Sequence, residues 1–214
     1  MSAERKIGAL VLAAGASRRM GEPKQLLLYR GRSLLRHAAE TAAASRCRPV
    51  IVVLGAHAES LRGELSELLM PRTVQVVENS GWMNGLGSSI SVGVRALAAA
   101  ENDIEALIIM LCDQPLVSAQ LIDKLIETYE RTGKSIVAAE YKGTMGVPAL
   151  FHRARFAELM ALGGDSGAKQ IIAKHNRDLE RVSFPEGDID IDTPQEYERL
   201  QATTADERSL VQGN

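Results

Sequence analysis

Short, uniformly apolar runs alternate with longer segments of helical periodicity, and this alternation most constrains how the chain can fold. The runs that we interpret as strands are residues 7–12, 50–54, 74–77, 106–111 and 135–139. The segments with helical periodicity are residues 33–44, 59–69, 88–99 and 119–132. Strands that alternate with helices indicate βαβ units, and strands that are apolar throughout indicate a sheet covered on both faces. We therefore predict an α/β fold, a single-domain three-layer sandwich with a mostly parallel, Rossmann-like sheet.

The pattern becomes less regular after residue 141. Candidate strands are residues 147–151, 179–183 and 188–191, and candidate helices are residues 153–162 and 168–175. Thr193, Pro194 and Glu196 predict the start of a final helix, because they combine a Thr N-cap, Pro at the first helical position and a capping-box Glu. We predict one domain over residues 1–201 and a flexible tail over residues 202–214, which are polar and aperiodic.

Composition excludes several classes of protein. The 214 residues carry 25 Lys and Arg against 27 Asp and Glu, a net charge of −2, which disfavours a general nucleic-acid binder. The longest nearly uncharged run, residues 7–16, is too short to span a bilayer and is not followed by a signal-peptide cleavage pattern. The two cysteines form no CxxC pair, so a zinc ribbon or disulfide scaffold is not expected. We expect a cytoplasmic protein without membrane or nucleic-acid partners.

The loop after the first predicted strand reads AAGASRRMGEPK over residues 13–24. Its small residues let the backbone approach a ligand closely, and Arg19 and Lys24 supply positive charge for phosphate oxygens. The spacing matches neither the P-loop nor the GxGxxG fingerprint. We interpret the loop as a triphosphate cradle, with an ordinary glycine-containing turn as the alternative.

Two acidic segments contain candidate metal ligands. Asp113 follows a predicted buried strand, at the edge of the sheet where open α/β folds bind ligands. Magnesium there commonly takes one or two carboxylates together with substrate phosphates. Asp190 and Asp192 alternate with Ile189 and Ile191, so strand geometry predicts both carboxylates on one face. A turn or capping Asp and a solvated edge strand are the respective alternatives.

Other conspicuous residues have simpler interpretations. The four histidines show no metal-ligand spacing, so we expect surface or structural roles. Cys112, at the end of a predicted strand, is expected to be packed rather than nucleophilic. Trp82, the single tryptophan, either stacks on a ligand or packs against its own loop.

The segments LAAGASRRMG followed by PK, then LCDQP, then DIDTP occur in that order and resemble the molybdenum cofactor cytidylyltransferase family. These molybdopterin nucleotidyltransferases belong to the glycosyltransferase-A-like nucleotidyltransferase superfamily, and the resemblance covers about residues 6–200. It implies a fold of the nucleotide-diphospho-sugar transferase type. It also implies Mg²⁺-dependent transfer of a cytidylyl group from CTP to the phosphate of molybdopterin, with release of pyrophosphate. LAAG, with Ala14, is typical of the enzymes that use CTP, whereas the guanylyl enzymes usually carry LAGG.

The resemblance further implies the site residues. The expected nucleotide contacts are Leu12, Ala13, Ala14, Gly15, Ala16, Ser17, Arg19, Lys24, Gly55, Ser88, Ser89 and Asp113. The expected acceptor contacts are Gln114, Pro115, Gly146, Pro148, Asp165 and Lys169. Arg19 and Lys24 are expected to act on the triphosphate and Asp113 to hold Mg²⁺, with Asp190 the preferred second ligand and Asp192 the reserve. The sequence departs from the family pattern at Leu86 and Gly87, where Met and Ser are common, and at Lys169, where Arg is common.

Several functional hypotheses remain open at this stage. The first is cytidylyl transfer to molybdopterin, which needs no general base because a phosphate monoester is already largely anionic at pH 7. The second keeps the chemistry but uses GTP, or an acceptor such as a sugar or polyol phosphate. The third is a nucleotide- or cofactor-binding maturation factor that docks on a client molybdoenzyme. The fold can also serve redox chemistry on a pigment-like substrate, although a dinucleotide fingerprint is missing.

Overall fold

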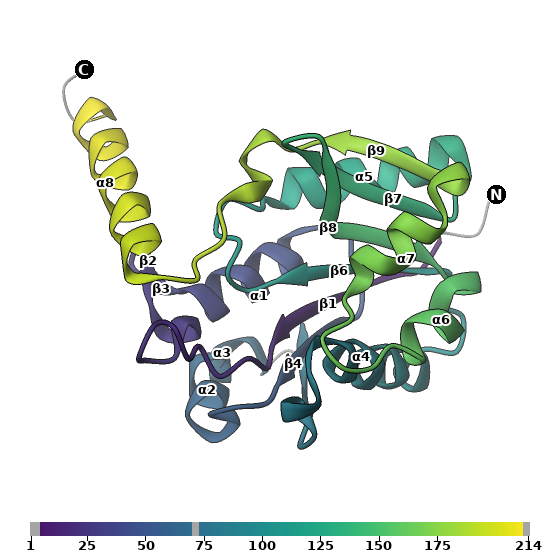
Figure 1. Cartoon of the computed structure of the whole chain (residues 1–214), viewed down its shortest axis with the longest axis horizontal. Coiled ribbons are helices and arrows are strands. Elements are labelled where there is room, and N and C mark those ends of the chain that lie inside the picture. Colours follow the sequence, from purple (N-terminus) through teal and green to yellow (C-terminus); the bar gives the residue numbers. More distant parts are fainter. Residues whose placement is uncertain (1–4, 70–72, 212–214) are drawn as a thin grey trace.

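The computed structural model describes residues 5–69 and 73–211, and a seven-stranded sheet lies at its centre (Figure 1). The strands are β1 (Ile7–Ala13), β4 (Val50–Leu54), β5 (Val74–Glu78), β6 (Ala106–Leu111), β7 (Ile136–Tyr141), β8 (Thr144–His152) and β9 (Leu179–Ser183). Their order across the sheet is β5-β4-β1-β6-β8-β7-β9. β8 pairs antiparallel with both β6 and β7, and the other neighbouring strands pair in parallel. The predicted mostly parallel α/β sheet is confirmed.

Helices cover both faces of this sheet. One layer contains α1 (Leu34–Ala44), α2 (Ala58–Glu64), the short α3 (Ser66–Leu69) and α5 (Ala119–Thr132). The other contains α4 (Leu86–Ala100), α6 (Phe156–Met160) and α7 (Ala168–Lys174). Alternate residues of each strand serve the two layers: on β1, Ala9 and Val11 join the core under α1 and α5, whereas Leu10 and Leu12 join the core under α4. This double burial explains why the strands read as uninterrupted apolar runs.

The helix ends follow local sequence signals. Ser33 and Ser118 cap α1 and α5, each accepting a hydrogen bond from a backbone N–H three residues later, at 3.2 Å. α5 ends at Gly133, which takes the left-handed conformation with φ of 65°. None of the helices in the described ranges is both long and apolar enough to cross a membrane.

Three predicted elements differ from the structure. One is the helix predicted over residues 153–162, which is divided into the 3-10 helix η3 (Arg153–Arg155) and α6. Residues 188–191 are not a strand, because Pro185–Asp188 forms a 3-10 turn (η5) and the chain then runs outside the sheet. Ile191 is instead buried in a small separate core beside Leu200 and the hairpin of β2 (Leu28–Tyr29) and β3 (Arg32–Ser33). The helix predicted over residues 59–69 is divided into α2 and α3 at Leu65.

The final helix, α8 (Pro194–Val211), begins where the capping box predicts. The Glu196 carboxylate accepts hydrogen bonds from the Thr193 backbone N–H at 2.8 Å and from the Thr193 hydroxyl at 2.9 Å. α8 projects from the body beside the β2–β3 hairpin (Figure 1) and continues past residue 202, farther than the sequence predicts. Residues 202–211 mix amino acids of high and low helix propensity, and the sequence does not explain the extra length. Flexibility of residues 202–214 in solution stays a prediction.

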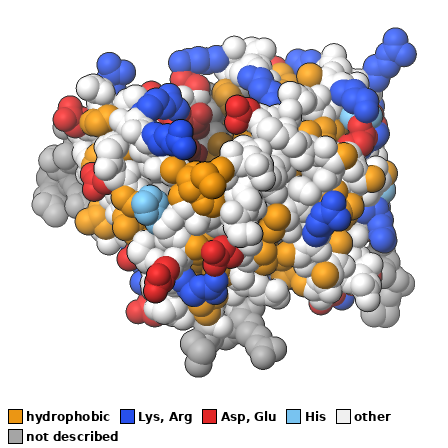
Figure 2. All heavy atoms as spheres, turned by 60° about the horizontal axis from the view of Figure 1, so that its bottom comes forward, with side chains coloured by type: hydrophobic (Ala, Val, Ile, Leu, Met, Phe, Trp, Pro, Cys, Tyr) orange, Lys and Arg blue, Asp and Glu red, His pale blue; other side chains and the backbone are white. Residues whose placement is uncertain are grey.

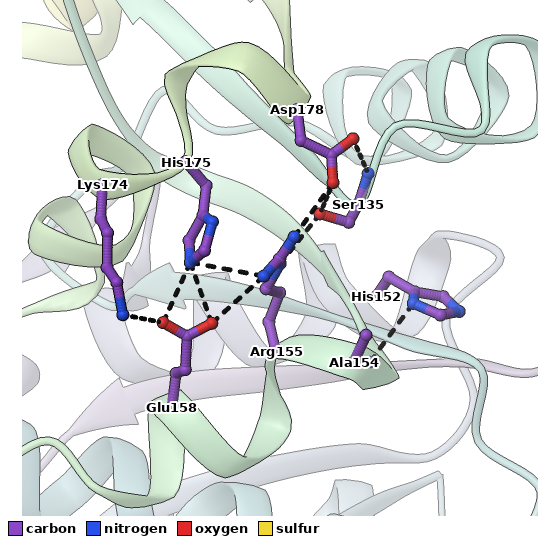
Figure 3. A network of polar contacts seen from close by, with 8 residues as sticks. All are labelled: Ser135, His152, Ala154, Arg155, Glu158, Lys174, His175 and Asp178. Atoms are coloured by element: carbon purple, nitrogen blue, oxygen red, sulfur yellow. Dashed lines mark hydrogen bonds and ion pairs between the residues drawn. The ribbon is translucent and has the colours of Figure 1, made fainter.

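A network of charged side chains fastens α6 and α7 to the β7 side of the sheet (Figure 3). Glu158 accepts from Lys174 Nζ at 2.7 Å and from His175 Nε2 at 2.9 Å. Arg155 bonds Asp178 at 3.0 Å, and Asp178 in turn accepts from the Ser135 backbone N–H at 3.2 Å. The connection between α6 and α7 supplies residues 163–167, which lie against the start of α4.

Gly85 allows this close approach, and its replacement tests the packing. Its φ is 89°, and a Cβ there would lie 2.2 Å from the Gly164 carbonyl oxygen. We expect Gly85→Ala to lower the free energy of unfolding by more than about 2 kcal/mol, because it adds backbone strain to a steric clash. The matched control is Gly63→Ala, since Gly63 lies in α2 with open space at its Cβ position. That change should stabilise by about 0.5–1 kcal/mol. Urea unfolding of both variants checks the pair, and equal effects would contradict it.

The Glu158 network predicts a pH-dependent contribution to stability. Hydrogen bonds from Lys174 and His175 lower the pKa of Glu158 from 4.5 to about 2. The ionised carboxylate is therefore favoured in the folded state, and its contribution is present above pH 4.5 and lost as the pH falls towards 2. Glu158→Gln should be less stable than wild type at pH 7, with the difference shrinking through that window. Thermal unfolding from pH 7 to pH 3 measures it, with Glu127→Gln on exposed α5 surface as the control. A difference that does not depend on pH would contradict the prediction.

Candidate active site

A ligand-sized cavity lies at the carboxyl ends of β1 and β6, where the strand order reverses. Its volume is about 490 Å³. The lining residues are Leu12, Ala13, Ala14, Gly15, Ala16, Ser17, Arg18, Lys24, Gln25, Trp82, Met83, Gly85, Leu86, Ser89, Leu111, Cys112, Asp113 and Asp165. The cavity is therefore built by the loops after β1, β5 and β6 and by the loop before α7.

The loop after β1 is held open by one buried amide. Gln25, 1% exposed, donates through Nε2 to the carbonyl oxygens of Ala13 at 3.0 Å and Gly15 at 2.7 Å. Its Oε1 accepts from the Ser17 hydroxyl at 3.1 Å, and Ser17 has φ of 53°. The backbone N–H groups of Gly15, Ala16 and Ser17 form no hydrogen bond with the described part of the chain. These three residues line the cavity, so the loop offers it backbone donors that the described residues do not use, as a phosphate cradle requires.

Lys24 lies in the wall of the cavity among carboxylates. Its Nζ contacts Asp113 Oδ2 and lies 2.8 Å from Asp192 Oδ1, and its side chain is 14% exposed. Burial disfavours the ammonium, but the charges and hydrogen bonds of Asp113 and Asp192 raise the pKa of Lys24 above its ordinary value. Lys24 is therefore charged at neutral pH and joins three distant chain segments.

The segment carrying Asp190 and Asp192 is anchored to the end of β6 by its backbone. The Ile191 N–H donates to the Asp113 carbonyl oxygen at 3.0 Å. Asp192 meets Lys24 and also Arg19 Nη2, at 2.7 Å. Asp190 is the more buried carboxyl of the pair, and burial together with the negative charge of Asp113 raises the pKa of Asp190 to about 6. The two acids therefore take different positions rather than sharing one strand face.

Asp113 and Asp190 have the features of ligands for a hard cation. Asp113 Oδ1 and Asp190 Oδ1 are both buried and have no hydrogen-bond partner among the described residues. Carboxylate oxygens left without a donor are costly in a protein interior unless a cation meets them. The described residues contain no cluster of three or more His, Cys, Asp or Glu with metal-binding geometry. Two carboxylates suffice for magnesium when substrate phosphates complete the shell.

The opposite wall of the cavity comes from the start of α4 and from the short 3-10 helix η2 (Trp82–Asn84). Met83 is 75% exposed and Leu86 39% exposed, and both line the cavity with Trp82. Figure 2, which brings the lower side of Figure 1 forward, shows hydrophobic side chains gathered near the centre of that face with charged side chains around them. The cavity therefore pairs a charged wall with an apolar one, an arrangement suited to a polyanion bearing a flat ring.

The structure brings some of the predicted residues into the cavity and leaves others outside it. Those in its lining are Leu12, Ala13, Ala14, Gly15, Ala16, Ser17, Lys24, Ser89, Asp113 and Asp165. Arg19 is exposed beside Asp192, and it is Arg18 that lines the cavity. Gly55 lies beneath the lining, where a Cβ would fall 2.6 Å from Trp82 Cβ and 2.7 Å from the Ala14 carbonyl oxygen. Ser88 is bound within the protein, donating to the Gly85 carbonyl oxygen at 2.8 Å.

All but one of the predicted acceptor residues lie outside the lining of this cavity. Pro115 lines a separate cavity between α1 and α5, and its carbonyl oxygen pairs with His37 Nε2 at 2.9 Å. Gln114 is buried next to Gly187, to whose carbonyl oxygen it donates at 3.3 Å. Gly146 and Pro148 lie within β8, and Lys169 is exposed on α7. Asp165 is the predicted acceptor residue that lines the cavity.

The sequence analysis did not identify several residues that shape the cavity through hydrogen bonds or packing. Gln25 fixes the loop conformation although it carries no charge, and its position directly after Lys24 was the available signal. Met83 and Leu86 follow no chemical motif, so nothing in the sequence marked them as cavity residues.

Lys24 balances the acidic cluster, which predicts how its removal affects stability. Lys24→Met leaves Asp113, Asp190 and Asp192 without their shared cation, so we expect a loss of about 3 kcal/mol in the free energy of unfolding. Millimolar MgCl₂ should recover more stability in this variant than in wild type, because the divalent ion can occupy the vacated charge position. Thermal unfolding with and without MgCl₂ measures both effects. Lys124→Met, at an exposed site on α5, should change stability by less than about 0.5 kcal/mol. An equal response to MgCl₂ in Lys24→Met and wild type would contradict the expectation.

Known proteins resemble this chain in sequence and in fold. Nicotine blue oxidoreductase of Paenarthrobacter nicotinovorans is 33% identical over 206 residues, which cover 91% of this chain and 96% of the relative. Rv0371c from Mycobacterium tuberculosis H37Rv has a TM-score of 0.75 and 29% identity over 92% of this chain and 97% of its own. Its complex with manganese has a TM-score of 0.72 and 28% identity, with the same coverage. A nucleotidyl transferase from Methanothermobacter thermautotroptrophicus, 23% identical with a TM-score of 0.76 over 94% of this chain and 98% of its own, shares the fold.

The model of the MobA-like NTP transferase domain matches residues 9–179, which include the loop after β1, the end of β6 and the start of α4. The predicted family resemblance is thereby confirmed at the level of this domain. The chain belongs to the MobA-like NTP transferase domain family and is a nucleotidyltransferase.

Proposed function

We propose that this protein transfers a cytidylyl group from CTP to the phosphate of molybdopterin, releasing pyrophosphate in a Mg²⁺-dependent reaction. The observation that carries the proposal is one cavity lined by the loop after β1, Lys24 and Asp113, in which the backbone N–H groups of residues 15–17 have no partner among the described residues. Asp113 carries a buried oxygen without a hydrogen-bond partner in the described part of the chain, and so does Asp190, which lies outside the lining. Donors and a cation suit the triphosphate, and the carboxylates suit the metal that accompanies it. The identity of the acceptor rests on the family resemblance.

Positioning and charge neutralisation are the tasks that this chain performs. The N–H groups of Gly15, Ala16 and Ser17 would hold phosphate oxygens, while Lys24 and Arg18 supply positive charge on the same side. Asp113 and Asp190 would hold a divalent ion, which when bound neutralises charge on the triphosphate. The attacking phosphate of the acceptor is already anionic near pH 7, so the described side chains need not remove a proton.

The choice of CTP is supported by the identity of Ala14, because the resemblance associates LAAG with family members that use CTP and LAGG with the guanylyl enzymes. Ala14 lines the cavity, and its carbonyl oxygen accepts from the Ala56 N–H at 3.1 Å, which fixes the backbone there. Ala14 therefore favours CTP, and the guanylyl reaction is the alternative.

A pyrophosphate-release assay with MgCl₂ and molybdopterin tests the function, with CTP, GTP, ATP and UTP in separate reactions. We expect release with CTP and a shift towards GTP in Ala14→Gly. Asp113→Asn should lower the rate by at least about a hundredfold, because it removes a metal-binding charge. The far-ultraviolet circular dichroism of that variant should match wild type. Release with GTP alone would overturn the choice of base and keep the chemistry.

The same assay separates the remaining alternatives. Release of pyrophosphate with CTP and a sugar or polyol phosphate, but not with molybdopterin, would overturn the acceptor. Nucleotide binding without release with any acceptor would favour a maturation factor that docks on a client molybdoenzyme.

An oxidoreductase is the second candidate, because the Paenarthrobacter relative at 33% identity bears that name. The loop after β1 does not match the GxGxxG fingerprint, so the sequence offers no standard site for a nicotinamide dinucleotide. Oxidation of NADH or NADPH in the presence of a coloured heteroaromatic substrate, followed by absorbance at the dinucleotide band, tests this candidate directly.

A further inference from the structure

Asn79 lies beneath the cavity wall and joins three partners through its side chain. The residue is 3% exposed and follows β5, where its backbone N–H donates to the Leu54 carbonyl oxygen at 2.8 Å. Its Oδ1 accepts from the Gly81 N–H at 3.0 Å. Its Nδ2 donates to Ser88 Oγ at 2.8 Å and to Ser89 Oγ at 3.0 Å. The Gly81 N–H is a donor, so it fixes which end of the amide carries oxygen and which carries the two hydrogens.

The hydrogen bonds of Asn79 determine how each serine hydroxyl donates and accepts. Each hydrogen of Asn79 Nδ2 is used by one hydroxyl oxygen, so both serine oxygens act as acceptors towards Asn79. Ser88 directs its own hydrogen back into the protein, to the Gly85 carbonyl oxygen at 2.8 Å. Ser89 has no such acceptor among the described residues, and it lines the cavity. The hydroxyl hydrogen of Ser89 is therefore left to point at whatever occupies the cavity.

We propose that Asn79 is a positioning residue that holds the Ser89 hydroxyl as a hydrogen-bond donor towards an acceptor atom of the bound nucleoside. This inference rests on the proposed function, because it assumes that the cavity takes a nucleotide. The acceptor atom is a carbonyl oxygen or ring nitrogen of the base, or a ribose oxygen. A free serine hydroxyl can either donate or accept, whereas one that already accepts from Asn79 is biased towards donation. Asn79 thus makes Ser89 a hydrogen-bond donor to the ligand without itself contacting the ligand.

Asn79→Asp reverses the hydrogen-bonding role of Ser89 while nearly preserving shape. The introduced carboxylate can still accept from the Gly81 N–H, but it has no hydrogen to give to Ser88 or Ser89. The Ser89 hydroxyl would then donate to the carboxylate and turn its lone pairs towards the cavity. We expect the Kd of CTP to rise about tenfold, since a donor is replaced by an acceptor at a desolvated contact. If a transferase assay is run in parallel, KM for CTP should rise while kcat at saturation stays within about twofold.

The test is a double-mutant cycle of nucleotide binding by titration calorimetry, with wild type, Asn79→Asp, Ser89→Ala and the double variant. Each is titrated with CTP, GTP, ATP and UTP. Ser91→Ala is the matched control, because Ser91 lies on the same helix but donates to the Met160 carbonyl oxygen at 2.8 Å. We expect Ser89→Ala to weaken CTP binding about as much as Asn79→Asp, and the double variant to bind no worse than either single variant. Ser91→Ala should bind CTP as wild type does.

The outcomes separate this inference from the proposed function. If the increases in the Kd of CTP from the two single changes multiply in the double variant, Asn79 and Ser89 act independently. That result would overturn the inference. Unchanged binding by Ser89→Ala would also overturn it, whether or not Asn79→Asp folds. Wild type that binds none of the four nucleotides would overturn the proposed function and the inference together. Wild-type binding with coupled losses at both positions supports both.

Discussion

The buried ammonium of Lys24 is the interaction on which the geometry of the site depends. It brings Asp113 at the end of β6 and Asp192 from the segment before α8 to the loop that follows β1. Without a cation between them, carboxylates from these segments would repel one another in a poorly solvated place. The ammonium therefore balances the charge of Asp113 and Asp192 and fixes the relative positions of the segments that carry them.

The sheet could be predicted from the sequence because its physical cause is local. β4, β6, α5 and β9 match the expected bounds, since burial on both faces makes a strand apolar at every position and a Ser cap marks where a helix starts. The segment 188–191 could not be predicted in this way. Alternation of Asp and Ile indicates a strand, but Ile191 is buried in the small core with Leu200 and its N–H bonds Asp113 instead of a neighbouring strand. Tertiary packing decided its conformation, and the printed sequence carries no trace of that partner.

Some residues of the candidate site could be predicted from the sequence, and others could not. Residues with charge or a glycine-rich context, such as Lys24, Asp113 and Gly15, could be identified because their chemistry is visible in the residue type. Gln25 and Asn79 could not, because a buried amide acts through the groups that it bonds and those groups are known only from the fold. Likewise, strand alternation predicted one shared face for Asp190 and Asp192, with Asp190 the preferred metal ligand and Asp192 the reserve. In the structure burial raises the pKa of Asp190, whereas ion pairing lowers the pKa of Asp192.

The contact between the start of α4 and the loop before α7 has a consequence for how this protein can diverge. Gly87 N–H donates to the Gly164 carbonyl oxygen at 3.1 Å, and a Cβ at Gly87 would fall 2.8 Å from the Gly163 nitrogen. The wall beside Ser89 and the loop that carries Asp165 are thus pressed together along bare backbone. A lengthened or reshaped 163–167 loop would shift the start of α4 with it. A substitution that changes the shape of one side of the cavity therefore also changes the shape of the other side.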